Sequence, residues 1–530
     1  MNRMVKIAIN KKLHHILNAV GVRYSALLLF VCITVSSMAQ NSPLDERITI
    51  ESRKVSLYEA LNIISEVIGY NFVYDSKDID SDSKVRLEAR NERVSSIISR
   101  IIQNPNIRAN VIDKYILLSN FKEINPRHAD SSIVDRSQPI VVKGRIFDKE
   151  TKEFIPYATI GVAELGIGTI SNMDGFFVLQ IPSKQSMSAI TISHLGYKSK
   201  MIPVELLSGQ QVDIYIEPQS ISIQEVIIRN VDPVALIEKS MAQKGNNYGD
   251  KAVYLTSFYR EGVEKNSNIL SYSEAVFKVY KSSYTRSPDL DQVKLLKSRK
   301  AKSGDQSDTL IVKMKGGINA SLSLDIVKSI PDFLDREYMS NYRYTKTDIV
   351  TLDSLLVYAI SFEQREGNNE ALFKGVLYIT MDSLAILGSD FEIDSRYITK
   401  SSSQLVVHKS RGVNATPTRA SYSVRYKIWN DRYYLSHIRC DLDLKVKKRS
   451  RLFSSNFHTF LEMVVIRIDN ENVVRFDRDE IVKSNTVFSD LEFSYDDKFW
   501  REFNFIAPEE SLQESLRKIV PQIENLEGTN

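Results

Sequence analysis

Strict alternation of apolar and polar residues over residues 433–446 (YYLSHIRCDLDLKV) constrains the fold of this 530-residue chain more than any other feature. Successive side chains of a β-strand point to opposite faces of a sheet, so a period of two predicts a strand with one face on a core and the other in water. The face predicted for the core carries Ile438, Cys440, Leu442, Leu444 and Val446. The face predicted for water carries His437, Arg439, Asp441, Asp443 and Lys445.

Other segments of the C-terminal half have the β-branched and aromatic composition of strands. They cover residues 252–261, 271–284, 355–364, 371–380, 385–393, 419–429 and 460–468. Together they predict a multidomain, β-rich α+β chain whose last domain, over 250–505, is an antiparallel sheet with a few helices, flat or else curved and open. Residues 323–334 are the candidate for a helix on this sheet, broken at Pro331, and 506–530 for a helical tail.

Residues 1–39 have the composition of a cleaved export signal. A basic region precedes an apolar run at 25–35, and small residues after that run predict cleavage before Gln40. A membrane anchor is the alternative, but a helix needs about 20 apolar residues to span a bilayer. A lipoprotein is a second alternative, disfavoured because Cys32 lies inside the apolar run.

Removal of the leader changes the charge of the chain. The formal net charge of +4 includes five basic leader residues and no acidic ones, so the mature chain carries +4 − 5 = −1. No global basic character remains to favour nucleic acid. Cys440 is then the one remaining cysteine, so no intrachain disulfide is expected and stability must come from core packing.

Residues 45–120 alternate short strands with amphipathic helices, which predicts two β-α-β units. The first helix, expected within 55–70, has Ser56 as a plausible N-cap, with Glu59 three residues later, and Gly69 as the residue that ends it. The other elements are expected at 47–52, 71–75, 84–104 and 110–119.

This region resembles the short N-terminal domain of secretins and of TonB-dependent outer-membrane receptors. The likeness lies in the pattern and spacing of ITIESRKVSLYEALNIISEVIGYNFVYD, VRLEARNERVSSIISRII and YILLS. The resemblance implies a periplasmic domain that makes protein contacts, in receptors often with an anti-sigma regulator.

After a polar linker at 121–138, residues 139–218 show short strands at the spacing of a seven-stranded β-sandwich. In its hairpin, GTISNMDGFFVLQIP, Gly175 is expected to take a positive φ and Asp174 to cap the turn with an Asx hydrogen bond. Gly196 marks a second turn.

The sandwich region resembles the carboxypeptidase regulatory-like domain, which has a prealbumin-like fold. The residues that carry the likeness are VVKGRIFDKETKEFIPYATI, GTISNMDGFFVLQIP and ISHLGYKSKMIPV. The resembled domain is non-catalytic even within carboxypeptidases. In Bacteroidetes-type bacteria it precedes the plug of starch-utilisation-type TonB-dependent transporters.

Residues 219–249 are predicted to be a connecting strand followed by a helix that begins at Asp232 and Pro233. The strand, 221–229, resembles the one that leads into the plug of those transporters. The remaining length is too short for a barrel of about 22 strands, so we expect no full transporter.

The segments AVYLTSFYRE, FKGVLYITMDSLAI and YDDKFWREFNFIAPEESLQESLRKI resemble a family of uncharacterised Bacteroidetes envelope proteins. Members of that family join a regulatory-like sandwich to a strand-rich region. The second segment also resembles the open, curved sheets of periplasmic lipoprotein carriers.

The sequence contains no zinc-binding motif, no GXSXG nucleophile motif and no P-loop. The histidines outside the leader are expected to be surface or packing residues: His128, His194, His408, His437 and His458. His437 shares a strand face with Asp441 and Asp443 and could form an acid/base pair, but charged residues on the wet face of a strand are the default. Cys440 is expected to be buried and a poor nucleophile. We therefore predict no catalytic residue, metal or cofactor.

A basic run follows the alternating strand. It consists of Lys445, Lys447, Lys448, Arg449 and Arg451. One interpretation is a solvated hairpin loop, and the other is contact with lipid phosphates or lipopolysaccharide at the periplasmic leaflet.

These observations predict a non-enzymatic periplasmic protein, associated with the outer membrane and linked through protein contacts to TonB-type transport or envelope signalling. Its expected partner is a protein such as a TonB-system or anti-sigma component. The first alternative is a carrier of a lipid or a lipoprotein acyl chain in an open C-terminal sheet. The second alternative is a small outer-membrane β-barrel.

Overall fold

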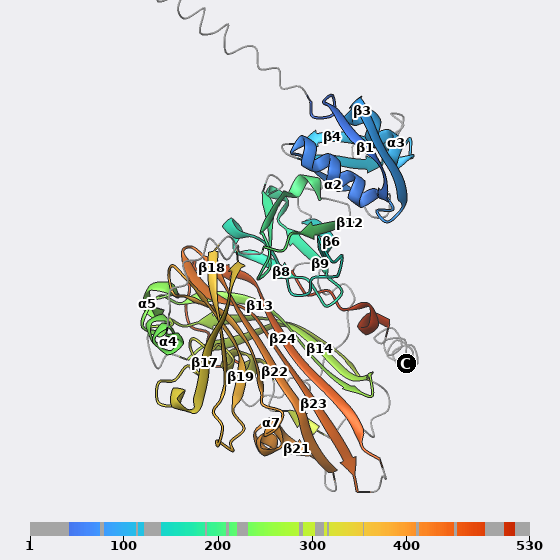
Figure 1. Cartoon of the computed structure of the whole chain (residues 1–530). Coiled ribbons are helices and arrows are strands. Elements are labelled where there is room, and N and C mark those ends of the chain that lie inside the picture. Colours follow the sequence, from blue (N-terminus) through green and yellow to red (C-terminus); the bar gives the residue numbers. More distant parts are fainter. Residues whose placement is uncertain are drawn as a thin grey trace, which may run out of the picture. The chain divides into compact units, whose positions relative to one another are not determined.

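The computed structural model describes most of the chain between Ser42 and Glu514. The described ranges are 42–74, 79–112, 115–120, 139–185, 188–207, 211–219, 232–285, 290–302, 312–314, 317–352, 355–409, 413–449, 453–482 and 503–514. The predicted leader, the linker at 121–138 and the strand at 221–229 lie outside them. The chain divides into two compact units, Met1–Ile124 and Asn125–Asn530, which are described separately (Figure 1).

The N-terminal unit consists of two small sheets and two helices. Its elements are β1 (Arg47–Ser56), α2 (Leu57–Ile68), β2 (Asn71–Tyr74), β3 (Lys84–Arg93), α3 (Val94–Ile102), β4 (Ile107–Ile112) and β5 (Tyr115–Asn120). β1 pairs with β3 in an antiparallel manner, while β5 lies between β2 and β4. The sequence predicted this order of strands and helices.

The ends of α2 follow from its capping residues. The Ser56 hydroxyl accepts a hydrogen bond from the Glu59 amide at 3.2 Å, and Gly69 ends the helix with a φ of +71°. Between these caps, Ala60 and Ile64 are fully buried against the two sheets. Both predicted caps are confirmed.

The C-terminal unit begins with a seven-stranded sandwich, as the sequence predicted. Its strands are β6 (Ile140–Asp148), β7 (Thr159–Val162), β8 (Ile167–Ile170), β9 (Phe176–Ile181), β10 (Ala189–Ser193), β11 (Lys200–Pro203) and β12 (Gln211–Ile216). One layer has the order β12-β6-β9 and the other β11-β10-β7-β8. Short 3₁₀ turns, η2 (Ala163–Leu165), η3 (Ser183–Gln185) and η4 (Val204–Leu206), lie between the strands.

The turn between β8 and β9 differs from its prediction in one respect. Gly175 does take a positive φ, +70°. The side chain that caps the turn is Asn172, whose Oδ1 accepts hydrogen bonds from the backbone N–H groups of Asp174 and Phe176 at 3.0 and 2.9 Å. The Asp174 carboxylate instead accepts a hydrogen bond from the Glu510 backbone N–H at 2.9 Å, because the C-terminal segment lies against this hairpin.

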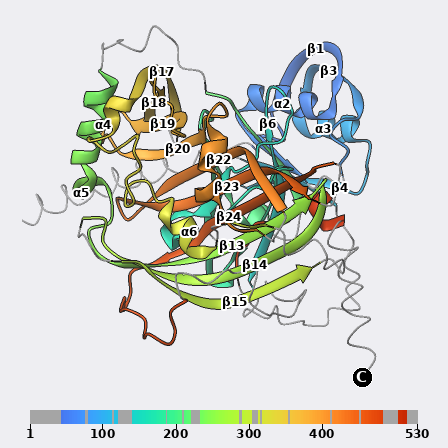
Figure 2. The same ribbon diagram turned by 90° about the horizontal axis from the view of Figure 1, so that it is seen from below.

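A ten-stranded antiparallel sheet follows and forms a curled, open half-barrel (Figures 1 and 2). Its order is β15-β14-β13-β24-β23-β22-β20-β19-β18-β17. The strands are β13 (Val253–Lys265), β14 (Asn268–Lys281), β15 (Gln292–Lys302), β17 (Tyr342–Leu352), β18 (Leu355–Gln364), β19 (Phe373–Thr380), β20 (Ile386–Ile393), β22 (Val413–Trp429), β23 (Arg432–Lys448) and β24 (Ser455–Asp469). The sandwich joins this sheet through one pair, Ile167 of β8 and Arg467 of β24.

The remaining elements of this unit are short. They are α4 (Pro233–Ala242), α5 (Lys244–Asn247), β16 (Val312–Met314), α6 (Ile318–Ser323), η5 (Met339–Asn341), η6 (Ile398–Ser401), α7 (Ser402–Leu405) and β21 (Val406–Lys409). The predicted cap of α4 is confirmed, since the Asp232 carboxylate accepts the Val234 amide at 3.0 Å and Pro233 occupies the first turn. Of the described helices, none combines the length and apolar character that a membrane crossing requires.

The inner face of the half-barrel is filled by the chain itself. One apolar cluster contains Val293 of β15 and Val357 of β18, two strands near opposite edges of the sheet. It also contains buried apolar residues of the segment 318–342, among them Val327 and Phe333. Phe333 is fully buried there and stacks on Phe362 with ring centroids 4.2 Å apart. Because one core reaches both ends of the sheet, the sheet must curl around it.

The helix predicted at 323–334 is wrong. α6 ends at Ser323, and the chain continues as turns that pack on the inner face. Asp325 is fully buried and its carboxylate meets the Lys281 ammonium at 2.6 Å and the Tyr426 hydroxyl at 2.6 Å. These tertiary contacts override the local helical preference.

Candidate functional site

The outer face of the half-barrel, opposite the filled interior, carries the charged residues that the alternation of β23 predicted to face water. This prediction is wrong for the first part of the strand. His437 is only 3% exposed, and its ring stacks on Tyr157 of the sandwich with centroids 5.4 Å apart. The Arg439 guanidinium lies over the same Tyr157 ring at 5.6 Å. The sandwich therefore covers this face.

A second cover is the C-terminal strap, residues 503–510. It runs along the sandwich hairpin, where the Thr169 hydroxyl donates to the Phe505 carbonyl at 2.9 Å and the Asn172 amide donates to the Ala507 carbonyl at 3.1 Å. Ile506 is fully buried in an apolar cluster with Phe258 and Val464 of the sheet. The strap thus touches both the sandwich and the half-barrel.

A buried charge cluster lies beneath these two covers. It consists of Arg260 on β13, His437 and Arg439 on β23, Glu462 on β24 and Glu509 of the strap. The Arg260 guanidinium is 2.6 Å from Glu462 and 2.8 Å from Glu509, and His437 Nε2 is 2.8 Å from Glu462. Arg439 adds a contact to Glu462 at 3.4 Å.

Strand register produces the cluster. Glu462 lies directly opposite Arg260 on one side and directly opposite Arg439 on the other. Opposite charges at facing positions of neighbouring strands attract, and the effect is stronger where water is excluded. Both Arg260 and Glu462 are 0% exposed.

These neighbours control the ionisation of Glu462. Burial alone would raise its pKa, but the charges of Arg260 and Arg439 and the His437 hydrogen bond outweigh burial and hold the pKa far below its ordinary value. Burial, followed by the charge of Glu462, raises the pKa of Tyr157. In this cluster each arginine therefore has a carboxylate partner, and Glu462 stays ionised.

The second histidine of this face has its own carboxylate partners. His458 Nδ1 is 2.7 Å from Asp443, and its Nε2 is 3.4 Å from Asp441. The hydrogen bond that His458 donates to the Asp441 carboxylate is the main cause that raises the pKa of His458, against the effect of burial. The grouping of His437 with Asp441 and Asp443 that the sequence suggested does not form. His437 contacts Glu462 instead, and His458 contacts the two aspartates.

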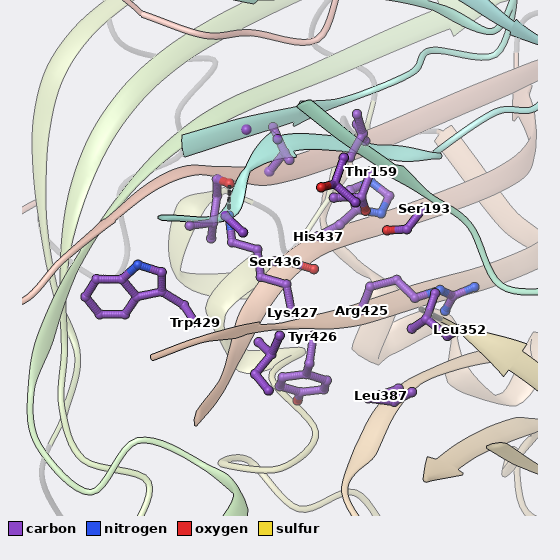
Figure 3. A pocket seen from close by; sticks show the side chains of 18 of the residues that line it. Thr159, Ser193, Leu352, Leu387, Arg425, Tyr426, Lys427, Trp429, Ser436 and His437 are labelled. Carbon is purple, nitrogen blue, oxygen red and sulfur yellow. Dashed lines mark hydrogen bonds between the residues drawn. The ribbon is translucent and has the colours of Figure 1, made fainter. Parts of the chain in front are cut away.

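A cavity of about 260 Å³ lies between the sandwich and the outer face of the half-barrel. β7, β8 and β10 form one wall, and β22, β23 and β24 form much of the other (Figure 3). Apolar side chains dominate the lining, among them Leu352, Leu355 and Leu387. In Figure 3 Lys427 lies centrally, and its ammonium donates to the Val465 carbonyl at 3.1 Å.

The remaining predicted residues lie apart from the cavity. Gly196 has a φ of +83°, and its amide donates to the Thr351 carbonyl of β17 at 2.7 Å, so this turn also joins the sandwich to the half-barrel. In the basic run, Lys445, Lys447 and Arg449 are exposed, whereas Arg451 lies outside the described residues. Cys440 is buried in the inner core, and burial raises the pKa of its thiol to about 12.

Sequence reasoning missed four residues of this region: Arg260, Glu462, Glu509 and Lys427. Arg260 and Glu462 are 202 positions apart, and Arg260 and Glu509 are 249 apart, so no local pattern connects them. Strand order brings Arg260 and Glu462 together, and the C-terminal strap brings Glu509 to Arg260. In the described part of the chain, no group of three or more His, Cys, Asp or Glu side chains is arranged to hold a metal ion.

Comparison with known proteins gives one firm result. Residues 142–228 match the family model of the CarboxypepD_reg-like domain. The predicted carboxypeptidase regulatory-like domain is confirmed. Because the match covers less than half of the chain, it describes the sandwich and not the whole protein.

The comparisons with curated proteins and with solved structures identify no further relationship. None of the curated proteins is similar to this sequence. A solved structure of a DUF1329 family protein from Desulfovibrio piger is similar at 11% sequence identity, with 46% of this chain and 96% of that chain covered and a TM-score of 0.21. This likeness does not bear on fold or function.

Proposed function

We propose that this chain is a non-enzymatic interaction protein, exported to the periplasm of a Bacteroidetes-like envelope and working at the inner side of the outer membrane. The charge cluster carries the non-enzymatic part of this proposal, whereas the export signal predicted at 1–39 and the resemblance of residues 45–120 to receptor N-terminal domains support its location. Glu462 accepts contacts from Arg260, His437 and Arg439, and these hold its pKa far below neutrality. An effective general acid or base needs a pKa near the working pH, so this carboxylate is suited to holding strands and covers together.

The two units have separate roles in this proposal. The N-terminal unit engages a TonB-system or anti-sigma component. The C-terminal unit, in which sandwich, strap and half-barrel share hydrogen bonds and ion pairs, is the rigid part to which that unit is linked. Val67 on α2 is 51% exposed, so this position is accessible to a partner of the N-terminal unit.

Photo-crosslinking in cells tests the partner. A photoreactive residue in place of Val67 is expected to give an adduct with an envelope protein of the TonB or anti-sigma class. The matched control is the same residue in place of Tyr338, an exposed position of the C-terminal unit at 45% exposure, which should give no such adduct. Absence of an adduct at Val67 would contradict the proposal. So would turnover of a metabolite by the purified chain that disappears in a folded Glu462→Gln variant.

The basic run supports contact with lipid phosphates as a further part of this function. Lys445, Lys447 and Arg449 are exposed at the end of the β23–β24 hairpin, and Phe453 in the same hairpin is 84% exposed. Each cation near an anionic surface contributes about 1 kcal/mol. The double substitution of Lys445 and Lys447 by Gln should weaken sedimentation with phosphatidylglycerol vesicles, whereas Lys251→Gln at another exposed site should not. Equal sedimentation of both variants would exclude this contact.

Carriage of an acyl chain inside the sheet stays a prediction and ranks second. It needs an open apolar groove on the inner face. In the described residues that space contains Phe333, Val327 and Ile326, all buried. Native mass spectrometry of gently purified protein would reveal a bound lipid if this alternative holds.

A further inference from the structure

The cavity between the sandwich and the half-barrel contains a cation that lacks an acidic partner. The Lys427 ammonium donates to the Val465 carbonyl at 3.1 Å, and none of the described carboxylates pairs with it. Burial lowers the pKa of Lys427 to about 8, with no contribution from a charged neighbour. An ammonium in an apolar cavity is costly unless an anion compensates it.

The other ionisable groups that line the cavity do not supply that anion. The Arg425 guanidinium is bound to Asp390 at 2.6 Å, and His437 is bound to Glu462 at 2.8 Å. Burial, helped by the charge of Arg425, lowers the pKa of His194 to about 4, so this ring is neutral at pH 7. Three tyrosines of the lining, Tyr157, Tyr378 and Tyr426, have raised pKa values, chiefly because of burial, and are also neutral. One uncompensated positive charge therefore remains.

The size and lining of the cavity define the rest of a ligand. Its volume of about 260 Å³ corresponds to roughly nine water-sized groups. Leu352, Leu355 and Leu387 offer an apolar surface, and Gly161 and Gly168 present backbone without side chains from the sandwich wall. A single cation balances one negative charge, whereas a dianion would leave charge unpaired in an apolar site.

We propose that this cavity binds a small monocarboxylate with an unbranched apolar tail of medium length, and that Lys427 pairs with the carboxylate. Sandwich and half-barrel each supply part of the wall, so the site exists only where the two are joined. This inference does not rest on the proposed partner of the N-terminal unit. It also places the ligand on the outer face of the sheet, away from the filled interior.

Titration calorimetry of the delipidated full chain with octanoate and octanol tests the site. Octanoate should bind one-to-one at pH 7. Octanol has the same tail but no charge, and its affinity should be lower by a factor of about ten or more. In Lys427→Gln the two probes should bind equally, while Lys427→Arg should keep the preference for octanoate. The matched control, Lys374→Gln, removes a lysine paired with Glu392 on the same sheet and should behave as the wild type.

Wild-type measurements keep the proposal falsifiable if the Lys427 variants fail to fold. Affinity should rise from butanoate to octanoate and fall for hexadecanoate, which exceeds the cavity. The affinity for octanoate should fall as the pH rises from 7 to beyond 8, where the amine loses its proton, while that for octanol stays constant. No octanoate binding, equal binding of octanoate and octanol by the wild type, or an unchanged preference in folded Lys427→Gln would overturn the proposal.

Discussion

Both faces of the half-barrel have buried regions, and these two regions are built from opposite kinds of residue. The inner face is an apolar cluster in which Phe333 stacks on Phe362. The outer face, under the sandwich and the strap, contains Arg260 and Glu462 with no exposed surface. Strand β23 contributes to both, since Ile438 lies inside and His437 outside.

This comparison teaches that a polar strand face is not by itself a wet face. Charged side chains can be buried when register gives each a partner of opposite sign, as it does for Glu462 between Arg260 and Arg439. An apolar face needs no such matching. The two faces should therefore respond differently to substitution and to pH.

The largest effect is expected on the inner face. Phe333→Ala should lower the free energy of unfolding of the C-terminal unit by about 3–5 kcal/mol, because it removes a fully buried ring and leaves a cavity. Urea denaturation followed by Trp429 fluorescence in a Trp500→Phe background measures this. Phe154→Ala, at a position that is 45% exposed, is the control and should have a much smaller effect. Equal losses at the two sites would show that the inner face is not the core.

Nearly as large an effect is expected on the outer face. Glu462→Gln should lower the free energy of unfolding by about 3 kcal/mol, since it leaves Arg260 and Arg439 without a buried counter-charge. The matched control is Glu363→Gln, which breaks an ion pair with Arg343 between side chains 45% and 64% exposed and should cost less than about 1 kcal/mol. A Glu462→Gln protein as stable as the wild type would mean that the cluster contributes nothing.

The pH dependence of the free energy of unfolding should also differ between substitutions on the two faces. The pKa of Glu462 is far below its unfolded value, so its contribution is fully present above about pH 5 and is lost as the pH falls through the acidic range. The stability advantage of the wild type over Glu462→Gln should shrink by up to about 1.4 kcal/mol per pH unit below pH 4. The Phe333→Ala loss should stay constant over that range. A constant advantage at Glu462 would contradict its low pKa.

The smallest effect concerns His458, whose pKa is raised chiefly by its hydrogen bond to Asp441. A raised pKa stabilises the fold below the unfolded pKa of about 6.5, and this contribution disappears as the pH rises through the folded value. The wild type should therefore lose slightly more stability than His458→Gln between pH 6 and pH 9. A thermal-melting series over this range measures the difference, and parallel curves would refute it.

Apolar alternation predicted the inner face well. The eight strands expected in the C-terminal half all form, and the predicted segment 355–364 coincides with β18. β15 (QVKLLKSRKAK) and β17 (YRYTKTDIVTL) were missed because these edge strands are rich in charged and polar residues. The helix predicted at 323–334 failed because the buried pairing of Asp325 with Lys281 is a long-range contact.

The outer face could not be predicted in the same way. Its residue types were visible, but their partners depend on strand order and on covers far away in sequence. Glu509 reaches Arg260 from the strap, and Tyr157 reaches His437 from the sandwich. Asn172, and not Asp174, caps the turn, because the Asp174 carboxylate accepts a hydrogen bond from Glu510 of the strap.

Hydrogen exchange followed by mass spectrometry tests most directly whether the charge cluster joins the sandwich to the half-barrel. Peptides from β7–β8 and from β23–β24 should lose protection together in Glu462→Gln, while Glu363→Gln leaves both unchanged. If β23–β24 exchanges faster while β7–β8 keeps its wild-type protection, the cluster stabilises the sheet alone and does not join the two parts.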